Sequence, residues 1–204
     1  MQLVIYDKRL KKDKKTRLNL SHIRNNTKYY KLNDTYIRLI GVRSIKTSKL
    51  SDFITMVQKL SLKGVTIQVI NARAAYGTDH LLGVLKVTLE SQKRNLTLTL
   101  KPEIDLLLRL SLTNQISLAL DHAGLKINQP AIIIIYSTNK KKVYNVESRI
   151  MKTVPNVNDT VLNIDKESRV HIFRLLANKR IRTSNLDDSF ITRYLIERSA
   201  LIIK

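Results

Sequence analysis

The 204-residue chain contains no cysteine and no tryptophan, and it has only five glycines and three prolines. Without cysteine it can form neither disulfides nor thiolate zinc sites nor a thiol nucleophile, and this favours a cytoplasmic location. The longest strongly apolar block, residues 131–136, is far shorter than the ~18 residues of a membrane-spanning helix. Charged residues follow the first six residues at once, an order that is not typical of a signal peptide.

Acidic residues are also scarce, because 37 Lys and Arg face only 16 Asp and Glu, which gives a net charge of +21. The excess is densest in residues 1–32. A field of this size favours a polyanionic partner through release of counterions from phosphates. A membrane surface is less favoured, since no strongly basic amphipathic helix with aromatic anchors stands out. A basic protein whose lysines are merely solvated remains the alternative interpretation.

Motifs of known catalytic sites are missing as well. The sequence has no Walker loop, no glycine-rich dinucleotide turn, no HExxH and no GxSxG. Its four histidines, at positions 22, 80, 122 and 171, lie far apart in the sequence. The pair Asp187-Asp188 stands where a helix is expected to begin, and there it complements the helix dipole. We therefore expect a protein that is not an enzyme and that holds no cofactor and no metal.

Periodic patterns predict an α/β (mixed α+β) single domain with a small central sheet packed by several helices, plus a basic N-terminal arm. We expect strands at 36–42, 65–71 and 131–137, and helices at 48–62, 78–95, 103–110, 113–123, 143–154, 166–177 and 186–203. Residues 96–100 are either a strand or a connector, and 139–142 form a basic turn. The domain covers 33–204 with a basic insertion around 155–184. In the extension 1–32, only the first six residues can pair as a strand.

Two segments carry polar residues where a site is plausible. In the first, Ile70–Glu90, Gly77 turns the chain from a buried strand into a helix whose first turn holds Thr78, Asp79 and His80. Taken alone, Thr78 and Asp79 are better explained as ordinary caps of the helix. Taken alone, His80 is better explained as a partly buried, hydrogen-bonded structural histidine.

The second segment, Glu103–Leu125, interrupts an apolar helical pattern with Ser-Leu-Thr-Asn-Gln at 111–115. Capping by Thr113 accounts for one hydroxyl, but it does not require Asn114 and Gln115. Amide side chains combine donors and acceptors, which can read base edges or a ribose. A polar elbow between two core helices is the alternative. Gly124 is expected to close the second helix in the left-handed conformation.

These motifs together resemble one family. The pattern G-x-x-H-L-L at Gly77–Leu82, then L-L-x-L-S-x-x-x-Q-I-x-x-A at Leu107–Ala119, then a glycine and an apolar strand, is similar to the tRNA-binding subunits of the KEOPS complex (the TPRKB-like, Cgi-type family). The resemblance covers 35–137 and resumes over 186–202. The chain departs from the family pattern at Leu112, where a glycine is usual. It keeps the pattern at Gly83, where a small residue is usual.

The resemblance implies a non-catalytic recruiter. Members of this family attach to the kinase-like ATPase subunit of KEOPS, and they bind tRNA, notably its single-stranded 3′ CCA end. The complex installs a threonylcarbamoyl group on the adenosine beside the anticodon. The predicted RNA-binding residues are Arg73, Gly77, His80, Asn114 and Gln115 near the tail, with Lys86 and Arg109 on phosphates. Tyr76 and His80 are the candidates for base stacking.

For the ATPase interface we expect an apolar face of the first and closing helices. Phe190, Leu195 and Ile196 are its candidates, although each is equally a candidate for the core. Two other functions compete with the recruiter. A basic ribosomal or ribosome-assembly protein would co-sediment with ribosomes, and an RNA-modifying enzyme would show a deep pocket with converging ionisable groups.

Overall fold

The computed structural model describes residues 4–6, 29–45, 50–61, 64–154, 156–178 and 186–202. The predicted basic stretch 8–17 and His22 lie outside these residues. The strands are β1 (Val4–Tyr6), β2 (Tyr29–Leu32), β3 (Thr35–Val42), β4 (Thr66–Asn71) and β5 (Ala131–Ser137). The α-helices are α1 (Leu50–Ser61), α2 (Gly77–Lys93), α3 (Pro102–Leu110), α4 (Ile116–Ala123), α5 (Lys140–Thr153), α6 (Lys166–Asn178) and α7 (Asp188–Ala200), and η3 (Ala72–Ala74) and η4 (Asp159–Leu162) are short 3₁₀ turns.

The five strands form one antiparallel sheet in the order β1-β2-β3-β5-β4. The sequence predicts β5 from its unbroken apolar run, which is typical of a strand buried on both faces. Successive side chains of a strand point to opposite faces. Accordingly Ile132 and Ile134 enter one hydrophobic cluster, whereas Ile133 and Ile135 enter another. This single strand therefore organises the core on both sides of the sheet.

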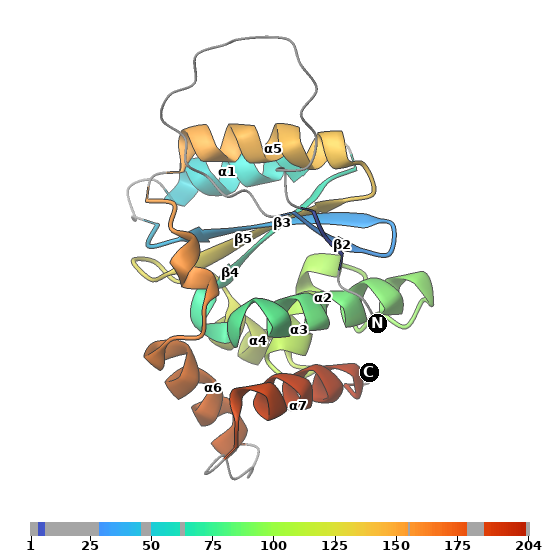
Figure 1. The fold of residues 1–204 in the computed structure, drawn as a ribbon, viewed down its shortest axis with the longest axis vertical. Coiled ribbons are helices and arrows are strands. Elements are labelled where there is room, and N and C mark those ends of the chain that lie inside the picture. The colour runs from blue at the N-terminus through green and yellow to red at the C-terminus, as the bar shows by residue number, and fades with distance from the viewer. Residues whose placement is uncertain are drawn as a thin grey trace.

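Helices cover both faces of this sheet (Figure 1). On one face lie α1 and α5, and on the other lie α2, α3 and α4. The last two helices, α6 and α7, add an outer layer beyond α2 and α3, away from the sheet (Figure 1). A third cluster, which includes Leu112, Ile191 and Leu195, fills the space beneath this outer layer.

The predicted mixed α+β fold is confirmed, and most elements lie where their patterns place them. Three details differ, and the open alternative for residues 96–100 is resolved. Strand β2 was not predicted, although Tyr29, Tyr30 and Leu32 are buried. Residues 96–100 are a connector, and the predicted turn 139–142 is instead the capped first turn of α5, where the Asn139 side chain accepts from the Lys142 N–H.

Gly124 is the third difference, because its φ of −66° is not left-handed. A Cβ at this position would lie 2.3 Å from the carbonyl oxygen of Leu120. Glycine is required here by a close backbone approach and not by the sign of φ. The division into an extension at 1–32 and a domain at 33–204 stays a prediction, although β2 of that extension pairs with β3.

Candidate functional site

The polar break in the sequence is the end of α3. After Ser111, Leu112 adopts the left-handed conformation with φ of 49°. The N–H of Leu112 donates to the carbonyl of Arg109 (3.2 Å), and the N–H of Thr113 donates to that of Leu108 (3.1 Å). This pair of hydrogen bonds is the Schellman arrangement, in which glycine normally takes the left-handed residue. The leucine instead buries its side chain in the third cluster, which offsets part of the backbone strain.

The two amides that follow are not needed to build this turn. Gln115 is the N-cap residue of α4, yet its side chain makes no capping hydrogen bond. The Thr113 hydroxyl accepts from the Gln115 N–H at 3.2 Å. The threonine side chain therefore stabilises the turn before α4. Asn114 and Gln115 are exposed, and neither side chain is bonded to another residue within the described part of the chain. Both amides are available to a ligand.

A cleft of about 370 Å³ lies at this break. The backbone turn supplies one wall, and α4 and the C-terminal end of α7 supply the others. The lining residues are Leu112, Thr113, Asn114, Gln115, Leu118, Arg198, Leu201 and Ile202. The lining thus combines two neutral amides, one guanidinium group and several aliphatic side chains. Such a surface can accept a planar, uncharged ring system beside a single negative charge.

The C-terminal wall of the cleft is fixed firmly against α2 and α3. Ile196 packs so closely on Gly83 that a Cβ there would lie 2.3 Å from the isoleucine Cδ1. Arg109 donates to the carbonyl of Ser199 at 2.8 Å, and Asp105 holds the same guanidinium at 2.9 Å. These contacts place α7 beside the break, and they explain why a small residue is present at position 83.

Residues 50–197 match the family described as Kinase binding protein CGI-121, a match that covers more than half of the chain. The chain belongs to the CGI-121 family. This family consists of non-catalytic, kinase-binding subunits of the KEOPS complex, so the predicted resemblance and the expectation that the chain is not an enzyme are both confirmed. No curated protein matches the chain.

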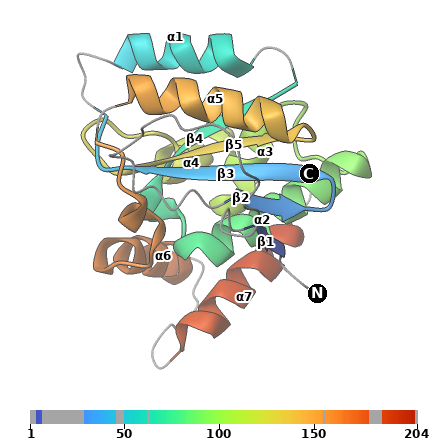
Figure 2. The same ribbon diagram turned by 45° about the horizontal axis from the view of Figure 1, so that its top comes forward.

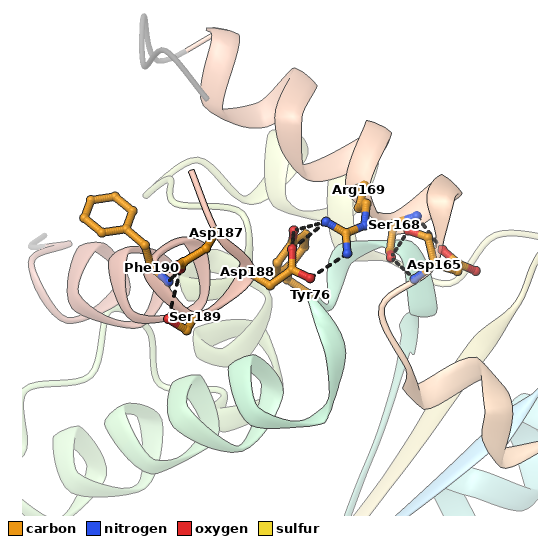
Figure 3. Close-up of polar contacts among 8 residues, drawn as sticks. All are labelled: Tyr76, Asp165, Ser168, Arg169, Asp187, Asp188, Ser189 and Phe190. Carbon is orange, nitrogen blue, oxygen red and sulfur yellow. Dashed lines mark hydrogen bonds and ion pairs between the residues drawn. The ribbon is translucent and has the colours of Figure 1, made fainter. Parts of the chain in front are cut away.

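An ion pair joins the last two helices of this CGI-121 protein (Figure 3). Both Arg169 nitrogens contact the Asp188 carboxylate at 2.5 Å, and Tyr76 donates to the same carboxylate. Arg169, and after it Tyr76, holds the pKa of Asp188 below its ordinary value. Burial, followed by the bond to Asp188, raises the pKa of Tyr76 to about 12. Asp187 caps α7 by accepting from the Phe190 N–H, so each carboxylate of the predicted pair has its own structural role.

Three of the seven predicted RNA-binding residues are buried. His80 is fully buried, and its Nδ1 accepts from the Tyr76 N–H at 2.9 Å. Burial lowers its pKa to about 3, so the ring is neutral near pH 7. Gly77 has a φ of 76°, and a Cβ there would lie 2.8 Å from Ile164. Arg109 is only 2% exposed. Direct contact of these three residues with RNA does not fit their burial.

The other predicted residues are more accessible, but only two lie in the cleft. Asn114 and Gln115 line it. The Arg73 side chain is 31% exposed and pairs with Glu167, and the half-buried Lys86 lies on α2. Tyr76, the candidate for base stacking, is buried, so it cannot stack on a base in this structure.

The predicted kinase-binding residues also divide by exposure. Leu195 is fully buried in the third cluster, and Ile196 packs on α2. Phe190 is 45% exposed, stacks on Tyr194 and points away from the Arg169–Asp188 pair (Figure 3). Two of these three residues therefore belong to the core, and only Phe190 presents an apolar surface.

Two histidines that are distant in sequence meet between α4 and α6. The His122 and His171 rings stack with centroids 4.0 Å apart, and burial lowers the pKa of His122 to about 3. No group of three or more His, Cys, Asp or Glu side chains in the described residues fits a metal ion. None of the described helices has the length and apolar character needed to cross a membrane.

Local sequence patterns do not predict the part of the cleft that α7 provides. The family resemblance over 186–202 includes the three residues of α7 and its C-terminal end that line the cleft, Arg198, Leu201 and Ile202. No local pattern, however, shows that this helix ends beside residue 114. The available signal was indirect. Gly83 on α2 and the buried pair Asp105–Arg109, four residues apart on α3, mark the surfaces on which α7 packs.

Proposed function

We propose that this CGI-121 protein binds the single-stranded 3′ CCA end of tRNA in the cleft at the α3–α4 break, while it is docked on the kinase-like ATPase subunit of KEOPS in the cytoplasm. One observation carries the proposal. The fold places two amides without a structural role beside an arginine, in a cleft large enough for a nucleotide base. The protein would hold the acceptor end while another subunit modifies the tRNA.

The chemistry of the cleft suits an unpaired nucleotide. Unstacked bases expose the donors and acceptors of their Watson–Crick edges, and a carboxamide matches such edges because it has both. Arg198 can neutralise a phosphate or stack on a base. The aliphatic side chains of Leu118, Leu201 and Ile202 offer apolar contact to a base face. Aromatic stacking is not available, since Tyr76 is buried.

Kinase docking requires an apolar surface that the fold leaves open. Phe190 retains that role in our proposal, because Leu195 and Ile196 are occupied inside the protein. A ribosomal function is less favoured than it was from the sequence alone, since the family is one of KEOPS subunits. It becomes the better explanation if the RNA-binding test below fails.

The test compares binding of the wild-type protein to full-length tRNA and to the same tRNA without its 3′ CCA, at matched salt. We expect the truncation to weaken binding about tenfold or more. The double variant N114A/Q115A should lose this difference, because each lost hydrogen bond to a base costs about 1 kcal/mol. N178A, which removes an exposed amide at the C-terminal end of α6, is the control. Equal binding of the wild-type protein to both tRNAs would refute recognition of the end.

A further inference from the structure

The outward face of α5 is strongly basic. Lys140, Lys141, Lys142, Arg149 and Lys152 are all exposed on this helix. Its single carboxylate, Glu147, is buried and bonded to Arg38 at 2.7 Å and to the Tyr29 hydroxyl. The acid therefore neutralises a buried arginine and not the exposed lysines. No other function described above uses this face.

Other helices of similar length do not share this charge. Both α2 and α7 carry two basic and two acidic residues, so their outer surfaces have no net charge. Helix α6 has three basic residues and one acid, but its Arg169 is paired with Asp188 of α7. With five basic residues and one acid, α5 has the largest excess of positive charge among the described helices. Of its cations, Lys141, Arg149 and Lys152 make no ion pair with any carboxylate in the described residues.

These three cations lie along one side of the helix. Residues 141, 145, 149 and 152 follow the spacing of four, four and three that aligns side chains on one helical face. Val143, Val146 and Ile150 occupy the opposite side and pack toward the sheet. From Lys141 to Lys152 the stripe is about 16 Å long. In Figure 2, α5 lies on the opposite side of the sheet from α7, so the stripe is remote from the cleft.

Stability of the fold does not explain the stripe. Lys141 stands in the first turn, where a cation opposes the helix dipole, and only Lys152, in the last turn, is favoured by that dipole. Apolar packing and the buried Glu147 already attach the helix to the sheet. Residues that break a local rule without a structural gain are expected at functional surfaces.

We infer that the α5 stripe (Lys141, Asn145, Arg149 and Lys152) is a second RNA-binding surface, which contacts the phosphodiester backbone of the tRNA body. The stripe has cations for phosphates and Asn145 for a sugar or phosphate oxygen, and contacts of this kind position an RNA backbone without reading its sequence. An amphipathic helix that binds a membrane inserts its apolar face, and the apolar face of α5 is buried against the sheet. The stripe therefore fits RNA better than a lipid surface.

The test is the salt dependence of binding to tRNA that lacks its 3′ CCA, so that failure of CCA recognition cannot affect the result. The variant is K141Q/R149Q/K152Q. Its matched control is K93Q/R94Q/K101Q, which removes two lysines and one arginine that are exposed at the other side of the molecule. Thermal unfolding of both variants checks that they fold.

We expect the slope of log K against log salt to decrease in magnitude by about 2 to 3 for the α5 variant and by less than about 1 for the control. At low salt the α5 variant should bind tRNA at least tenfold more weakly, whereas a CCA oligonucleotide should bind it as well as it binds the wild-type protein. Equal losses in both variants would show a general charge effect and overturn the proposal. It would also be overturned if the α5 variant kept its RNA affinity but lost binding to phosphatidylserine vesicles or to poly-glutamate.

Discussion

The two sides of the sheet differ in what they offer to an RNA. On the side of α2, α3, α4 and α7, a cleft of about 370 Å³ presents two amides with one arginine among aliphatic residues. On the side of α5 (Figure 2), the exposed face of one helix has three cations in line, Lys141, Arg149 and Lys152. One side thus offers a cleft with neutral hydrogen-bonding groups and a single cation. The other side offers several cations on the surface of one helix.

This difference corresponds to the two kinds of contact by which proteins recognise nucleic acids. Contacts to phosphates give affinity and orientation, whereas contacts to base edges give specificity. A recruiter needs both, because a CCA end alone is short and a backbone alone is common to all RNA. Placing the two kinds of contact on opposite sides lets each act on a different part of one tRNA. Single substitutions on either side of the sheet test whether the two surfaces act separately.

Removal of the Glu147 carboxylate, on the α5 side of the sheet, should lower the free energy of unfolding most. The substitution E147A leaves Arg38, which is 3% exposed, without its main counter-ion and Tyr29 without its acceptor. A buried charge that loses its partner costs about 3–5 kcal/mol. Urea unfolding measures the loss, with E197A on the exposed face of α7 as the control. A loss below about 1 kcal/mol would mean that the ion pair does not hold α5 in place.

On the cleft side of the sheet, low pH should reduce the free energy of unfolding because of His80. Because burial lowers its pKa to about 3, the unfolded chain binds a proton more readily than the folded protein. The contribution of the neutral His80 ring to the free energy of unfolding is therefore complete above the unfolded pKa of about 6.5. It is lost as the pH falls toward 3. Between pH 7 and pH 5 it amounts to about 2 kcal/mol.

The variant H80Q tests this, since its amide oxygen can still accept from the Tyr76 N–H. We expect H80Q to lose about 2 kcal/mol less stability than the wild-type protein between pH 7 and pH 5. Thermal or urea unfolding at both values gives the comparison. The same pH dependence in both proteins would assign the acid response to another group, such as the buried His122.

The smallest effect should come from Phe190, which belongs to neither RNA surface. Only a minority of interface residues cost more than about 1 kcal/mol when truncated to alanine, and buried aromatic anchors are prominent among them. F190A should therefore reduce affinity for the kinase-like subunit by about fivefold to tenfold and leave tRNA affinity unchanged. Titration calorimetry with each partner separates the two. A loss of tRNA binding without a loss of kinase binding would place Phe190 on the RNA side.

Much of the fold follows from local patterns, whereas the site depends on tertiary contacts. The run Ile132–Ile135 predicts a central strand because it is apolar on both faces, and β5 confirms it. Strand β2 escaped prediction because its four residues, YYKL, lie beside a lysine-rich segment and contain a lysine themselves. Burial of its tyrosines is decided by the neighbouring strand.

In the site, the break itself was predictable but its other wall was not. Apolar periodicity stops at Ser111, and the Schellman turn at Leu112 confirms an interruption there. Arg109 shows the limit of such reasoning. Its charge suggests a phosphate ligand, yet it is buried between Asp105 and the carbonyl of Ser199. Only the packing of α7 decides that this arginine is structural and that Arg198 is available.

The most direct test of this two-sided account is hydrogen exchange of the protein alone, with a short RNA ending in CCA, and with intact tRNA. If the two surfaces act separately, the short RNA protects amides only around residues 112–115 and 198–202. Intact tRNA then protects these amides together with those near the exposed face of α5. Protection of α5 by the short RNA, or no protection of the break by either RNA, would contradict this two-sided account.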